Sequence, residues 1–108
     1  NTMSWMFLLI AGVFEIGWPL GLKLSQTTAN KVTWILVSIV SMTLSGLFLW
    51  VAQKSIPIGT AYAVWTGIGA AGTFLIGIAF FEDPANTPRI LSVILIVLGI
   101  IGLRLYQV

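Results

Sequence analysis

Four long apolar stretches constrain the fold of this chain more than any other feature of its sequence. They cover residues 4–22, 32–51, 58–81 and 89–106, with short polar breaks between them. Each is close in length to the ~20 residues that a helix needs to cross a bilayer. Only helices and closed barrels satisfy their backbone in lipid, and four strands are too few to close a barrel. We therefore predict an all-α membrane protein whose residues 1–108 form a single four-helix transmembrane domain.

The composition indicates a surface that faces lipid. Of the 108 residues, 58% are hydrophobic and 7% are charged, whereas soluble domains carry about 25% charged residues. No basic residue precedes the first apolar stretch and Glu15 lies inside it, so we interpret that stretch as a retained span rather than a signal peptide. The five Lys and Arg residues do not cluster, which argues against nucleic-acid binding.

The residue types that are missing exclude several kinds of chemistry. The chain has no Cys and no His, which removes thiolate ligands and the commonest metal ligand, so we expect no metal site. It also lacks a GxxxxGK[ST] phosphate loop, so it does not use ATP itself. We expect no cofactor and no enzyme activity.

The polar breaks predict antiparallel helices and an almost balanced topology. Pro57 suits the first turn of the third helix, and Pro84 and Pro88 mark the last break. Breaks this short make sequential helices antiparallel. The basic residues then divide between the two membrane faces as Lys54 and Arg104 against Lys23, Lys31 and Arg89. A difference of one charge hardly selects an orientation, so the sequence fits insertion in both orientations as well as one weakly preferred orientation.

Glu15 is the residue most indicative of function. It lies about eleven residues into the first stretch, near the bilayer midplane at ~1.5 Å per residue. A charged carboxylate there is costly and marks a functional site by default. Every Lys and Arg lies near the end of a stretch or in a break, so Glu15 must hold a proton, be hydrated, or bind a cation from outside. Alternation between a proton and a cation is proton-coupled exchange; the alternative is a permanently protonated residue that bonds another helix.

Neighbours at helical spacing support the exchange hypothesis. Gly12 and Trp18 share a helix face with Glu15, Gly12 leaving space and Trp18 providing an aromatic wall. Pro19 frees a backbone carbonyl in the same region. Simple packing of small residues explains Gly12 equally well, but an interfacial role fits Trp18 poorly, because interfacial aromatics prefer the ends of spans.

The second and third stretches each carry a polar face. In the second, the polar stripe is Trp34, Ser38, Ser41 and Ser45, and its hydroxyls either donate to a carboxylate or bond the i−4 carbonyl of their own helix. In the third, the shared face is Tyr62, Trp65, Thr66 and Gly69. A tyrosine hydroxyl suits a carboxylate and an indole face suits a cation.

Glycines in the third and fourth stretches allow bending or close packing. Gly67 and Gly69 form either a point where the third helix bends or a small-residue packing face. In the fourth stretch, Ser92, Gly99 and Gly102 offer close helix approach and no ionisable group lies within the span. Association is therefore the expected role of the fourth helix.

Two sequence blocks resemble a known family. Residues 12–23 read G-V-F-E-I-G-W-P-L-G-L-K and residues 57–69 read P-I-G-T-A-Y-A-V-W-T-G-I-G. Together with the length and four-span layout, they resemble the small multidrug resistance family of bacterial transporters. Trp18, three residues after Glu15, is similar to the guanidinium-exporter branch, whereas quaternary-ammonium exporters tend toward small residues there. Pro19 departs from the non-proline residue usual in that branch.

The resemblance implies a role for each matching residue. Glu15 would be the shared proton and substrate site. Its surroundings would be the hydrogen-bond partners Trp18 and Ser45, the coupling residue Tyr62, the cavity-lining residues Gly12 and Trp65, and a helix bend at Gly67 and Gly69.

The expected function is proton-coupled antiport that exports guanidinium or small substituted guanidinyl cations, with the proton as coupling ion. The resemblance implies a multi-pass protein of the bacterial cytoplasmic (inner) membrane that works as an antiparallel, dual-topology homodimer. One alternative is export of hydrophobic quaternary ammonium compounds. Others are a non-transporting membrane subunit and one half of a heteromeric transporter pair.

Overall fold

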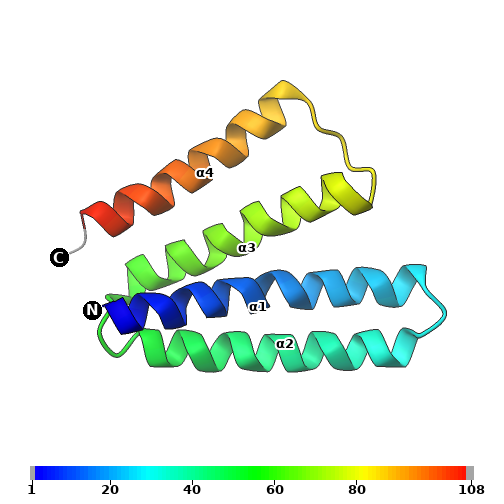
Figure 1. The fold of residues 1–108 in the computed structure, drawn as a ribbon, viewed down its shortest axis with the longest axis horizontal. Coiled ribbons are helices and arrows are strands. Elements are labelled where there is room, and N and C mark those ends of the chain that lie inside the picture. Colours follow the sequence, from blue (N-terminus) through cyan, green and yellow to red (C-terminus); the bar gives the residue numbers. More distant parts are fainter. Residues whose placement is uncertain (1, 107–108) are drawn as a thin grey trace.

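Residues 2–106 form four helices joined by short turns in the computed structural model (Figure 1). The helices are α1 (Thr2–Thr27), α2 (Lys31–Ala52), α3 (Ile58–Phe80) and α4 (Thr87–Leu105). Each is long and apolar enough to cross a membrane, and no strand occurs within residues 2–106. The prediction of an all-α membrane protein with four transmembrane helices is confirmed.

The helix ends do not coincide with the ends of the apolar stretches. α1 continues past residue 22 to Thr27, where the Thr27 hydroxyl donates to the Lys23 carbonyl at 3.2 Å. Asn86 caps α4 by accepting a hydrogen bond from the Arg89 amide at 3.1 Å. Pro57 is the N-cap of α3, one position before the first turn that the sequence predicts for it.

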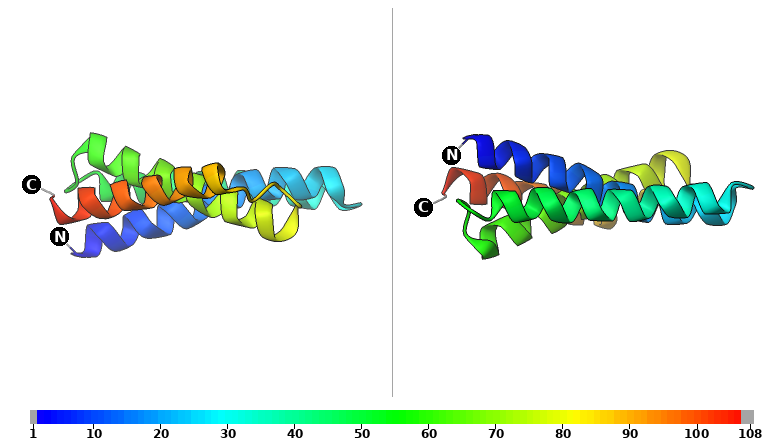
Figure 2. Two further views of the ribbon diagram at one scale, coloured as in Figure 1. Left: turned by 90° about the horizontal axis from the view of Figure 1, so that it is seen from above. Right: turned by 90° about the horizontal axis from the view of Figure 1, so that it is seen from below.

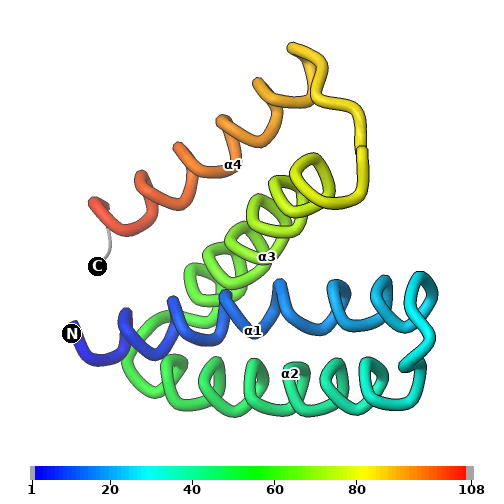
Figure 3. The backbone as a smooth tube through the Cα atoms, turned by 45° about the vertical axis from the view of Figure 1, so that its right-hand side comes forward, coloured from blue at the N-terminus to red at the C-terminus, as the bar shows by residue number. Residues whose placement is uncertain are grey.

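α1 is the central helix of the chain. It packs along α2 on one side and against α3 on the other, whereas α4 contacts only α3 extensively. α3 crosses α1 at an angle, so the two helices lie close near the chain termini and separate toward the α3–α4 turn (Figures 1 and 3). The molecule measures 47 × 34 × 17 Å, and Figure 2 shows how thin this layer of helices is. A layer of this kind leaves one side of the α1–α3 crossing open.

The buried apolar core lies at the end of the molecule that carries both termini. There α1, the end of α2 and the start of α3 meet, and the core residues are Trp5, Leu8, Ala52, Ile56, Ala61 and Val64. α4 takes little part in this core. Every residue of α4 is described, and none of them is buried. At its ends, Arg104 lies over the Trp5 ring and Arg89 over the Phe74 ring, each 5.0 Å from the ring centroid.

The serine stripe of α2 faces α1, and Ser38 and Ser45 bond neither of the two expected acceptors. Ser38 Oγ donates to the Trp18 carbonyl and Ser45 Oγ donates to the Ala11 carbonyl, each at 2.8 Å. These acceptors are backbone atoms of the neighbouring helix, not a carboxylate and not the serines' own helix. Glycine permits the approach, because a Cβ at Gly17 would lie 2.9 Å from Ser41 Oγ.

Candidate functional site

Glu15 lies on the face of α1 that is turned toward α3. Its side chain is half-buried and rests against the backbone of α3 at Gly69. A Cβ placed on Gly69 would lie 2.5 Å from Glu15 Cγ, which is far inside van der Waals contact. The absence of a side chain at Gly69 therefore sets the position of the carboxyl group.

Trp18 holds one oxygen of the Glu15 carboxyl group. Its indole Nε1 donates a hydrogen bond to Glu15 Oε1 at 2.8 Å. The three-residue spacing brings the two side chains to one face of α1, as the sequence predicts. An indole nitrogen is a donor only, so this contact fixes Oε1 as an acceptor and orients the whole carboxyl group.

A cleft beside Glu15 runs between α1 and α3. It has a volume of about 420 Å³, within the range typical of small-molecule sites. Its lining residues are Glu15, Pro19, Thr66, Gly69, Ala70, Thr73, Phe74 and Asp83. A second cleft of about 270 Å³ shares Pro19, Thr73 and Asp83 with the first and also reaches Lys23. The open side of the α1–α3 crossing thus leads from Glu15 toward the α3–α4 turn.

Ser45 of α2 connects three helices at the level of Ala11, which lies one turn before Glu15 on α1. It is 1% exposed, and it accepts a hydrogen bond from Trp65 Nε1 at 2.7 Å while donating to the Ala11 carbonyl. A hydroxyl has one hydrogen, and Ser45 gives it to the Ala11 carbonyl in the described chain. The role beside Glu15 that the resemblance implies for Ser45 stays a prediction.

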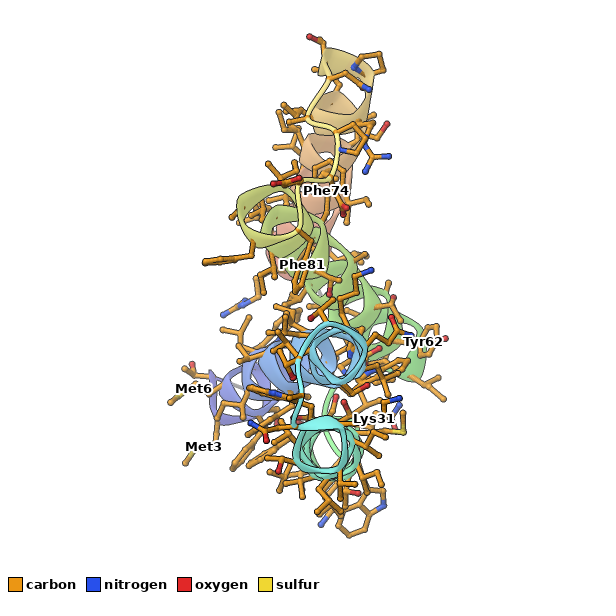
Figure 4. The ribbon with its side chains drawn as sticks, turned by 90° about the vertical axis from the view of Figure 1, so that its right-hand side faces the viewer. Met3, Met6, Lys31, Tyr62, Phe74 and Phe81 are labelled. Atoms are coloured by element: carbon orange, nitrogen blue, oxygen red, sulfur yellow. The ribbon has the colours of Figure 1, made fainter. Side chains whose placement is uncertain are left out.

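Tyr62 and Trp65 form an aromatic pair on α3. Their ring centroids are 5.5 Å apart and the ring planes are inclined by 56°. Tyr62 is 57% exposed, and Figure 4 shows it at the outer edge of α3. The structure thus links Tyr62 to Ser45 through Trp65, and the coupling role of Tyr62 stays a prediction.

Three glycines that the sequence singles out are sites of close helix contact. Gly12 would place a Cβ 2.7 Å from Ile68 Cγ2, so it packs against α3 and does not line the cleft beside Glu15. Gly67 would place a Cβ 2.8 Å from Ile100 Cδ1 of α4. α3 is one continuous helix through Gly67 and Gly69, and a bend there stays a prediction.

Comparison with known proteins identifies the family of the chain. The family described as Small Multidrug Resistance protein matches residues 3–96. The chain belongs to this family. The small multidrug resistance chain is 48% identical over 103 residues to the guanidinium exporters of Yersinia pseudotuberculosis and Escherichia coli K12. This match covers 95% of the chain and 98% and 97% of the two relatives. It is 47% identical to the guanidinium exporter of Salmonella typhimurium, over 95% of the chain and 97% of that relative.

The cleft also contains residues that the sequence does not single out. Thr73 continues the polar face of α3 one turn beyond Gly69, a position that helical spacing alone identifies. Asp83 reaches the cleft because the chain folds back after α3: its amide donates to the Gly77 carbonyl at 3.1 Å. Gly77 is the sequence signal for this contact, since a Cβ there would collide with the Asp83 carboxylate.

Proposed function

We propose that this small multidrug resistance protein is a proton-coupled antiporter that exports guanidinium or small substituted guanidinyl cations. The observation that carries the proposal is the Glu15 carboxyl group, which Trp18 orients at 2.8 Å on the wall of the α1–α3 cleft. The named guanidinium exporters of Yersinia and Escherichia, similar over 95% of the chain, support the same substrate class.

The proposed chemistry is an exchange of two positive ligands at one carboxyl group. A bare carboxylate near the bilayer midplane is costly, and either a proton or a cation removes that cost. Guanidinium is planar and carries several N–H donors, which match the two oxygens of a carboxylate. When guanidinium binds, the carboxyl proton leaves; when the proton returns, the cation is released. The cycle needs only the proton gradient.

Export of hydrophobic quaternary ammonium ions is the second candidate. These ions donate no N–H bonds and depend on aromatic and apolar surfaces. Pro19 and Phe74 in the cleft lining favour such ligands. Both candidates use Glu15, so the relative transport of the two ion classes separates them. A non-transporting subunit would move neither.

We infer that the working unit is an antiparallel homodimer with dual topology in the bacterial inner membrane. The single chain leaves α4 without a buried residue among those described, and its Gly99 and Gly102 would each accept a Cβ without meeting a described atom within 4 Å. This free small-residue face suits a second helix. Two copies also bring two Glu15 carboxyl groups to one cavity. The second copy closes the side of the cleft beside Glu15 that a single chain leaves open.

Transport by purified protein in proteoliposomes tests the function. We expect guanidinium gradients to drive larger proton fluxes, read with a pH-sensitive dye inside the vesicles, than tetra-alkylammonium gradients do. Glu15→Gln removes both fluxes and Glu15→Asp retains part of them, because aspartate keeps the carboxyl group. The matched control is Glu82→Gln, which removes the chain's other glutamate in the exposed α3–α4 turn and leaves transport intact. Coupled transport by Glu15→Gln would contradict the mechanism.

Proton release on binding is a second, independent test. Because proton and cation are proposed to exclude one another at Glu15, acidification weakens guanidinium binding, and guanidinium displaces protons into an unbuffered medium. Thermodynamic linkage requires both effects together. Guanidinium binding that releases no protons, together with an affinity that acidification leaves unchanged, would contradict exchange at a shared carboxyl group.

A further inference from the structure

The turn of α1 that carries Glu15 and Trp18 is weakened by a proline. Pro19 lies inside α1, and without an N–H it cannot donate to the carbonyl of Glu15, four residues earlier. The helix therefore loses a backbone hydrogen bond in the turn where Trp18 must aim its indole at the carboxyl group. Another contact is needed to hold this turn in one geometry.

Ser38 of α2 provides a contact to this turn. Its Oγ donates to the Trp18 carbonyl at 2.8 Å, and the Ser38 side chain is only 4% exposed. Gly21, one turn after Trp18, leaves room for it, since a Cβ there would collide with Ser38 Oγ and lie 3.0 Å from the Trp34 carbonyl. This buried hydroxyl is a cross-helix support for the backbone beside the proline.

We propose that Ser38 is a positioning residue for the cation site, acting through Trp18. The inference rests on the proposed function of Glu15. One hydrogen bond fixes the Trp18 carbonyl from α2, and a second, from the Trp18 indole, fixes the Glu15 oxygen. Residue 18 is thereby held at its backbone and at its side chain. Loss of the Ser38 hydroxyl lets the indole direction vary, which weakens the orientation of the carboxyl group toward a planar cation.

Serine variants test the proposal in proteoliposomes. We expect Ser38→Ala to raise the guanidinium KM by about threefold to tenfold, the factor that one hydrogen bond is typically worth, with little change in kcat. Ser38→Thr restores a hydroxyl and recovers the KM. The control is Thr28→Ala in the α1–α2 turn, whose exposed hydroxyl bonds the Leu24 carbonyl away from the candidate site and from the α4 association face. An unchanged KM in Ser38→Ala overturns the proposal.

A double-mutant cycle separates action through Trp18 from a general loss of packing. In a Trp18→Phe background the indole donor is gone, so Ser38→Ala should add almost no further increase in KM. Effects that multiply in the double variant instead show that Ser38 acts independently of Trp18, which overturns the proposal.

A spectroscopic readout keeps this inference distinct from the proposed function. The Trp18 indole N–H signal is assigned by its loss in Trp18→Phe. We expect Ser38→Ala to shift that signal and to speed its hydrogen exchange, whereas Thr28→Ala leaves it in place. If the parent protein carries no guanidinium, the proposed function fails, and the indole signal still decides whether Ser38 positions Trp18. An indole signal that Ser38→Ala leaves unmoved overturns the inference.

Discussion

At the scale of single residues, the site is defined as much by a missing side chain as by the groups present. Gly69 lets the Glu15 side chain rest on the α3 backbone, and Trp18 then holds one of its oxygens at 2.8 Å. The carboxyl group is therefore fixed from two helices, although the chemistry resides on one. Small changes on α3 should displace it.

We predict that Gly69→Ala lowers guanidinium affinity by about fivefold or more, because overpacking of this kind typically costs about 1–3 kcal/mol. The added Cβ would sit 2.5 Å from Glu15 Cγ, so the carboxyl group must move. Isothermal titration calorimetry measures the change. The control is Gly59→Ala on the same helix, where a Cβ meets no described atom within 4 Å. Equal affinities for the two variants would show that Glu15 does not depend on this contact.

The sequence predicts the contact that lies on one helix and leaves open the contacts that span helices. Glu15 and Trp18 meet because three residues separate them on α1, and periodicity is sufficient for that. Ser45 bonds the Ala11 carbonyl and the Trp65 indole in the described chain, and its role beside Glu15 stays a prediction. The partners of Ser45 depend on the relative positions of α1, α2 and α3 along their axes, which no single-helix pattern contains.

At the scale of elements, the helices follow from hydropathy, whereas their pairing and turns depend on local contacts. The central place of α1 depends on glycines such as Gly17 and Gly72, which admit Ser41 of α2 and Ile16 of α1 at short range. The α3–α4 turn depends on Glu82, whose φ of 59° lies in the left-handed region. Side chains with a Cβ are disfavoured in that region, and the pattern of polar residues in the turn does not reveal it.

We predict that Glu82→Gly stabilises the protein by about 1 kcal/mol, since glycine adopts a positive φ without the Cβ penalty. Thermal unfolding in detergent measures the gain as a higher melting temperature. Glu82→Ala is the control, because it removes the charge and keeps the Cβ. A gain of the same size in Glu82→Ala would assign the effect to the charge and not to the backbone.

At the scale of the whole molecule, a single chain does not fully enclose the cleft beside Glu15. The cleft beside Glu15 opens from a layer 17 Å thick, and α4 has no buried residue anywhere along its described length. The basic residues divide as two and three between the faces, so little in the charge pattern opposes either orientation. Both features fit a second copy of opposite orientation.

We predict that the protein inserts in both orientations. The chain has no cysteine, so Asn30→Cys introduces a single label site in the α1–α2 turn, where the Asn30 side chain makes no capping bond. A membrane-impermeant maleimide should label roughly half of the copies in intact cells and the rest only after permeabilisation. Full labelling or no labelling in intact cells, in a variant that still transports, would rule out dual topology.

The exposure of α4 also determines how pairing of two chains depends on their concentration in the membrane. Lipid tails are as apolar as the leucines and isoleucines of α4, so two copies gain little from the hydrophobic effect when they meet in a bilayer. Their association is then a competition with lipid for the same helix surface, and the number of chains per lipid sets its outcome. For a transporter that works as a pair, flux through a sparsely populated membrane grows with the square of the copy number. It becomes proportional to copy number only after most chains have found a partner.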